Sequence, residues 1–190
     1  MTTTGTFIAS AALVGLLVAP AAASSIGSSA TPQSRQMTLE REAADLVSQI
    51  ERTAHEVRVH AETLAQASAN PLVLPATHYH HLAMLQGLVN TRLAPAMTRL
   101  RQLQADLPEW KQASIERMFD AVSMLSSHAT VAIAAKRSDP LLMPLMNDAY
   151  RDRIRLVATH AETLTRTADA AHSYATARIK AQEVGLMVSR

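Results

Sequence analysis

Apolar residues recur at steps of three and four along most of the chain beyond residue 37, which is the spacing of one face of an α-helix. The first series stops before Pro71, because the residue preceding a proline is pushed out of helical geometry. Pro95 falls inside the second series and predicts a kink there. The pattern predicts four long helices and one short helix, at 38–69, 76–105, 107–137, 147–185 and 140–146.

Four amphipathic helices joined by short connections favour an all-α fold, an antiparallel up-down-up-down four-helix bundle with a kinked second helix. The chain has 190 residues, of which 48% are hydrophobic and 3% aromatic, so its core is expected to be aliphatic and rich in alanine. Only 5 glycines and 8 prolines interrupt the good helix formers. We therefore expect one bundle domain over residues 37–190.

The N-terminus has the pattern of an export signal. Residues 7–18 form an apolar run, followed by Pro20 and the A-x-A pattern of residues 21–23. We predict a signal peptide over residues 1–23, cleaved after Ala23, and an exported protein, periplasmic or extracellular. A non-cleaved anchor is the alternative, since no Lys or Arg precedes the run, but the run is short against the ~20 residues of a spanning helix.

Residues 24–36 are small and polar without periodicity, which predicts a disordered leader. No later stretch is expected to be long and apolar enough to span a membrane, so no stable membrane span is expected after signal cleavage. The formal charge is +2 and the basic residues are scattered among acidic ones, which argues against nucleic acid as a partner. Another protein, or self-association, is the expected kind of partner.

The pentapeptide HAETL occurs twice, at residues 60–64 and 160–164, in the first and the last long helix. In both copies the helical spacing places Ala and Leu inward, His at the edge of the apolar face and Glu outward. A duplicated hairpin would relate the first helix to the third, whereas the match relates the first to the fourth. We therefore interpret the repeat as close packing of two adjacent helices around Ala61 and Ala161, and the sequence leaves duplication open.

Eight histidines are the unusual chemical feature of this cysteine-free chain. His60, His128 and His160 each precede a small inward-facing alanine, and His81 precedes Leu82 in the same way. Rise along the helices places them in one half of the bundle. We predict a metal site formed by His60, His128, His160 and His81, and copper, zinc or nickel is the metal that suits imidazole ligands without thiolates.

A second interpretation is that these rings only fill gaps beside alanines and bind nearby carboxylates. Glu51 with His55 and Glu56 with His60 have the i,i+4 spacing of such pairs. Under this interpretation the histidines have a local structural role and no metal binds.

Other cofactor classes have weaker support. A di-iron bundle needs two Glu-x-x-His motifs, and the chain offers only Asp169-x-x-His172. A non-covalent haem would need axial ligands such as Met37 and His172. No phosphate loop, nucleophile elbow or HExxH motif occurs, so we expect a non-catalytic protein. The leading hypothesis is an exported binding or association protein; the alternatives are a haem-binding electron-transfer bundle and a structural module that contacts a partner, for example through residues 141–146.

Overall fold

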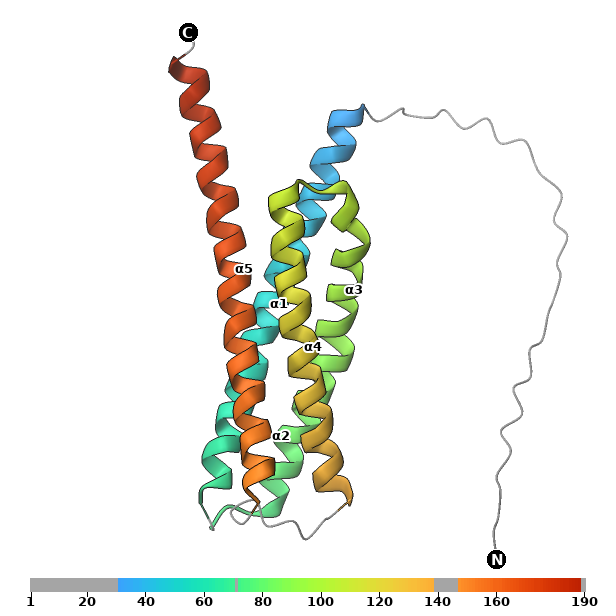
Figure 1. Ribbon diagram of the computed structural model, residues 1–190, viewed down its shortest axis with the longest axis vertical. Helices are drawn as coiled ribbons and strands as arrows, with labels where there is room; N and C mark the ends of the chain where they lie inside the picture. The colour runs from blue at the N-terminus through green and yellow to red at the C-terminus, as the bar shows by residue number, and fades with distance from the viewer. Residues whose placement is uncertain (1–30, 71, 139–146, 189–190) are drawn as a thin grey trace, which may run out of the picture. The chain divides into compact units, whose positions relative to one another are not determined.

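The computed structural model describes residues 31–70, 72–138 and 147–188 (Figure 1), and all regular secondary structure among them is helical. The all-α prediction is therefore confirmed. The predicted signal peptide and the predicted short helix at 140–146 lie outside the described residues. The elements are α1 (Pro32–Ser68), α2 (Pro75–Gly87), a π-helix (Leu88–Leu93), α3 (Ala94–Leu103), a 3-10 turn (Gln104–Asp106), α4 (Glu109–Ser138) and α5 (Asp148–Val188).

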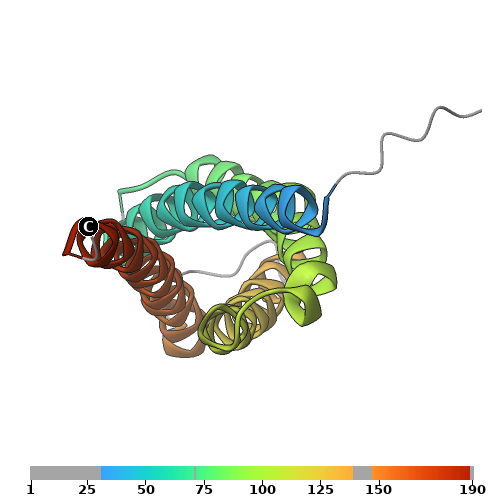
Figure 2. The same ribbon diagram turned by 90° about the horizontal axis from the view of Figure 1, so that it is seen from above.

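The helices pack in a ring. α1 contacts α5 on one side and the continuous α2–α3 segment on the other, and α4 contacts α5 and α2–α3. Figure 2 shows the four segments following one another around the ring in chain order. In Figure 1, α1 and α4 run towards one end while α2–α3 and α5 run towards the other.

The first helix begins six residues before its predicted start at Thr38. Thr31 is the N-cap, with its hydroxyl accepting from the Ser34 N–H at 3.4 Å, and Pro32 occupies the first turn, where its missing N–H costs nothing. Gln36 then bonds to Glu40 at 3.2 Å. Residues 32–36, which were predicted to belong to the disordered leader, are therefore helical. The N-cap and the proline in the first turn favour a helix start here despite the polar composition.

The interruption predicted near Pro95 takes the form of a π-helix just before it. Pro95 has no N–H to offer the carbonyl of Thr91, and its ring would crowd that carbonyl in a regular helix. The wider turn relieves this conflict, with the Ala94 N–H bonding to the carbonyl of Val89. The apolar face stays directed inward, since Val89 and Leu93, near the two ends of the π-helix, are both buried.

The two HAETL copies lie in the interface between α1 and α5, the most extensive helix contact in the described residues. Their alanines, Ala61 and Ala161, and their leucines, Leu64 and Leu164, are all 0% exposed. The predicted close packing of these two helices is thereby supported. The buried face of α5 ends before Ile179, which is 58% exposed.

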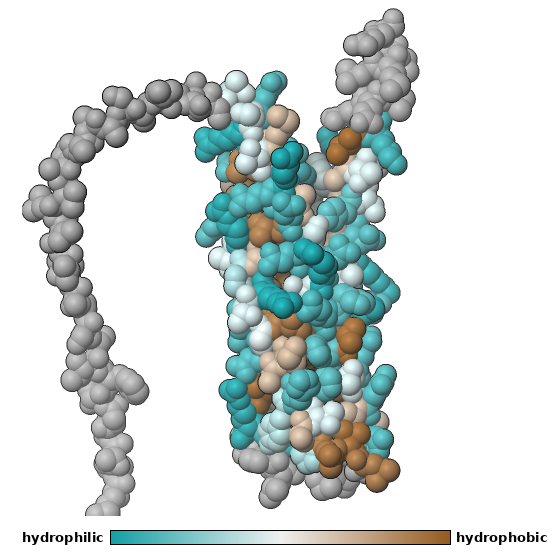
Figure 3. Space-filling model, turned by 180° about the vertical axis from the view of Figure 1, so that it is seen from behind, coloured by the Kyte–Doolittle hydropathy of each residue, from teal (hydrophilic) through white to brown (hydrophobic). Residues whose placement is uncertain are grey.

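By length and composition α4 is apolar enough to cross a membrane over Glu109–Arg137, contrary to the sequence expectation. A core helix has the same composition, and α4 contributes Met118, Leu125 and Ala132 to the packed interior at 0% exposure. The outer surface in Figure 3 is largely hydrophilic with a hydrophobic group at one end. Leu72 and Leu74, in the α1–α2 connection, are 87% and 70% exposed.

Candidate functional site

His60 on α1 and His81 on α2 form a direct imidazole pair. Their Nδ1 atoms are 2.9 Å apart and their ring centroids 5.2 Å apart, so one Nδ1–H donates to the other Nδ1. Their chain neighbours Ala61 and Leu82 are buried, which fixes the two helices at this separation. Partial burial, followed by the charges of His60 and His80, lowers the pKa of His81 below its ordinary value. The lowered pKa favours the neutral form of the His81 ring.

His128 on α4 and His160 on α5 form a second pair, with stacked rings 5.3 Å apart and 16° from parallel. The Arg153 guanidinium donates to His128 Nδ1 at 2.9 Å, which requires that nitrogen to be unprotonated. Burial, then the charge of Arg153 and that of His160, lowers the pKa of His128. In this pair the Nδ1 atom of His128 is already occupied by a hydrogen bond.

The four histidines predicted as one metal site are thus brought together two by two. The described residues hold no group of three or more His, Asp or Glu side chains placed to bind a metal ion. Successive side chains on a helix are turned by about 100° from one another. A residue just before a buried position therefore points towards a helix beside the core. That neighbour is α2 for His60 and α4 for His160, so the rings enter two different interfaces.

The predicted local carboxylate pairs are wrong. Glu56 binds the Arg92 guanidinium at 2.9 Å instead of His60. Glu51 lies 3.8 Å from His172 on α5 instead of pairing with His55. Contacts between helices replace the i,i+4 contacts, and His60 is left to bond with another imidazole.

A buried polar group that the sequence analysis missed lies near the first pair. His78 and Tyr150 are 3% and 2% exposed, their rings lie 6.3 Å apart, and neither His78 Nδ1 nor the Tyr150 hydroxyl has a hydrogen-bond partner in the described part of the chain. Burial, then the charge of the buried Lys136 and that of His81, lowers the pKa of His78. The spacing of His78 and Leu82, four residues apart on one helix face, was the available signal.

These histidines predict a pH-dependent stability. Below the ordinary histidine pKa of about 6.5 the unfolded chain takes up protons that folded His78, His81 and His128 resist, so stability is complete above that pH and falls as the pH drops through it. We expect the urea midpoint of unfolding to be lower at pH 5.5 than at pH 7.5. His78→Gln should weaken this dependence, with His55→Gln at an exposed position as control. A urea midpoint that rises on acidification would contradict the lowered pKa values of His78, His81 and His128.

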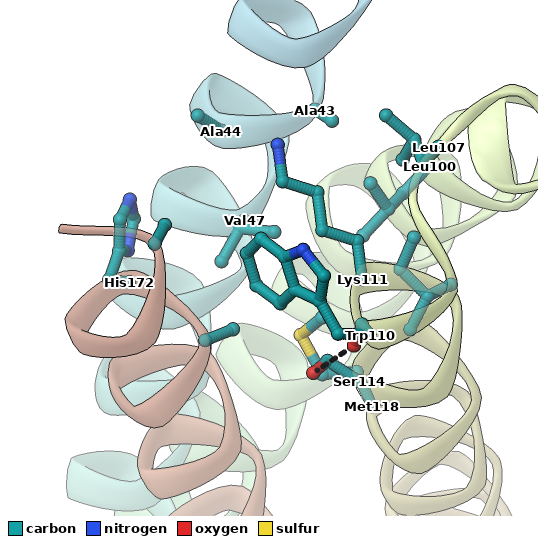
Figure 4. A pocket seen from close by; sticks show the side chains of 13 residues that line it. Ala43, Ala44, Val47, Leu100, Leu107, Trp110, Lys111, Ser114, Met118 and His172 are labelled. Atoms are coloured by element: carbon teal, nitrogen blue, oxygen red, sulfur yellow. Dashed lines mark hydrogen bonds between the residues drawn. The ribbon is translucent and has the colours of Figure 1, made fainter. Parts of the chain in front are cut away.

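The opposite end holds an apolar cleft between α1, α4 and α5, with a free volume of about 60 Å³ (Figure 4). Trp110 lines the cleft, and the centroid of its ring lies 4.8 Å from that of Tyr174. His172 also lines it, but Met37 does not and is 66% exposed. The cleft is far smaller than a haem, so the predicted Met37 and His172 ligand pair does not fit a haem at this place.

Two arrangements therefore carry chemistry: imidazole pairs between helices, and an apolar cleft beside the single tryptophan. The first suits a cation that accepts nitrogen ligands, and the second suits an apolar group. Searches against protein-family profiles, curated proteins and solved structures found no match to this chain.

Proposed function

We propose that this chain is an exported, antiparallel up-down-up-down four-helix bundle with a non-catalytic role, the binding of one transition metal ion by His60 and His81. The observation that carries the proposal is the 2.9 Å separation of their Nδ1 atoms across the contact between α1 and α2. Neighbouring helices of a bundle are a common place for metal ligands, because the helix backbones hold the side chains in register.

The spacing of the two nitrogens is close to that of two ligands on one ion. Zinc–imidazole bonds of about 2.0 to 2.1 Å at a tetrahedral ion separate the two nitrogens by roughly 3.3 Å. The nitrogen–nitrogen distance of His60 and His81 thus needs to increase by only a few tenths of an ångström, and the two rings need to turn so that both Nδ1 lone pairs point at the ion. The ion would take the place of the proton between the two Nδ1 atoms, and that proton would move to Nε2 of its own ring. The lowered pKa of His81 favours the neutral ring that metal binding requires.

The environment favours an exchangeable ion over a permanent structural one. Both rings are only half-buried. The His80 ring lies 5.2 Å from that of His81, but the described residues hold no group of three or more His, Asp or Glu side chains placed to bind one ion. Water would therefore complete the coordination, which leaves positions open for ligand exchange. Copper, zinc and nickel accept such nitrogen-rich sites. This combination suits uptake and release of a metal ion outside the cytoplasm.

Calorimetric titration of the purified chain with Zn²⁺ or Cu²⁺ tests the proposal. We expect one ion per chain and an affinity about tenfold lower in His60→Ala and in His81→Ala, as one of two protein ligands is lost. His160→Ala should bind as the parent does, which separates a two-histidine site from the four-histidine site. His55→Ala is the matched exposed control on α1.

Equal affinities of the parent and His60→Ala would contradict the proposal, as would a loss of binding in His160→Ala alone.

Export is tested by the cell fraction in which the protein is found and by its N-terminus. The chain recovered from the periplasmic or extracellular fraction is expected to begin at Ser24 by mass spectrometry. A cytoplasmic chain that keeps residues 1–23 would contradict export.

A further inference from the structure

The cleft beside Trp110 exists because small residues face one another where two helices separate. Ala43 lines it from α1, and Ala171 and Ala175 line it from α5. Figure 1 shows α5 leaning away from α1 towards its C-terminal end, and a methyl side chain is too short to fill the space that opens. Met118 forms part of the floor at 0% exposure. The result is an apolar hollow open at one end of the helices.

The indole of Trp110 separates this cleft from a second, shallower groove between α4 and α5. Trp110, Ser114 and Ala171 line both, so the two spaces adjoin around the indole. The centroid of the indole ring lies 4.8 Å from that of Tyr174. Figure 4 shows the indole among the side chains that line the cleft. A slender ligand that starts in the cleft can therefore continue along the groove.

The mouth of the cleft carries an excess of positive charge. Lys111 Nζ lies 3.1 Å from a Glu40 carboxylate oxygen, and the Arg178 guanidinium carbon lies 5.8 Å from the Trp110 ring and 6.0 Å from the Tyr174 ring. Burial raises the pKa of Glu40, but bonds from Lys111 and Gln36 and the nearby charge of Arg178 lower it overall. Glu40 is therefore ionised and neutralises one cation, and Arg178 has no carboxylate within ion-pair distance among the described side chains.

We propose that this cleft binds the alkyl end of a small unbranched amphipathic carboxylate, and that Arg178 and Lys111 attract its carboxylate at the mouth. The free volume of about 60 Å³ is suited to the end of one alkyl chain. The apolar walls remove methylene groups from water, and the surplus cation at the mouth complements the anionic head. This ligand site is separate from the histidine pairs and does not depend on metal binding.

The single tryptophan makes the cleft directly observable. Octanoate titrated into the full chain is expected to change Trp110 fluorescence saturably. Ala171→Leu, which fills the cleft, should abolish that change, while Ala177→Leu at an exposed position of α5 should leave it intact. Circular dichroism checks that Ala171→Leu folds, and Ala175→Leu provides a second filling variant.

Octanol separates the contribution of the carboxylate charge to the binding affinity from that of the alkyl chain. Arg178→Gln should lower the affinity for octanoate by about fivefold and leave the affinity for octanol unchanged. No saturable change with octanoate, unaltered octanoate binding in both filling variants, or equal effects of Arg178→Gln on the two ligands would overturn the proposal. A Trp110 signal that follows protein concentration instead of octanoate would assign the cleft to a second copy of the chain and would also overturn it.

Discussion

Truncation of Leu164 to alanine is expected to lower the free energy of unfolding by about 3 kcal/mol. Leu164 is 0% exposed in α5, and its removal leaves a cavity between helices that cannot close without moving the α1–α5 contact. Leu64, its counterpart in the other HAETL copy, is equally buried, and Leu64→Ala should cost a similar amount. Urea denaturation followed by circular dichroism measures both.

A matched control lies on the same helix. Leu156 in α5 is 37% exposed, so Leu156→Ala should cost less than about 1 kcal/mol. If Leu156→Ala and Leu164→Ala destabilise the protein equally, the two leucines do not differ in burial as described, and the inward role of the HAETL leucine would have to be abandoned.

Enlargement of Ala61 to leucine is expected to lower the free energy of unfolding by about 2 kcal/mol, because the extra methylene groups have no space between α1 and α5. Ala161→Leu should behave in the same way from the opposite helix. Thermal and urea unfolding provide the measurement, with Ala83→Leu at an exposed position of α2 as control. A leucine that leaves stability unchanged or raises it at Ala61 would show that the helices are not closely packed there.

Most helices could be predicted from the sequence because a packed helix must repeat its apolar face every three to four residues. The start of α1 was missed because the cap at Thr31 and the proline after it act locally, without an apolar series to mark them. The form of the interruption at Pro95 was also missed, since a proline predicts a conflict but the choice of a π-turn depends on keeping Val89 and Leu93 buried together.

The histidines that contact one another were predicted as residues, but their pairing was not. The position of each histidine just before an inward alanine or leucine predicted that the ring would lie at a helix flank. Which neighbouring helix meets that flank depends on the order of helices around the ring, and the structure pairs His60 with His81 and His128 with His160. The cleft beside Trp110 was missed because it arises from the divergence of α5, which leaves no periodic mark.

The most direct measurement of the proposed function is a ¹⁵N NMR spectrum of the histidine side chains during addition of Zn²⁺. The proposal predicts that one equivalent shifts the Nδ1 resonances of His60 and His81 together, and leaves those of the exposed His55 in place. Unchanged His60 and His81 resonances, or a response that begins at His128 and His160, would contradict the assignment of the metal to the contact between α1 and α2.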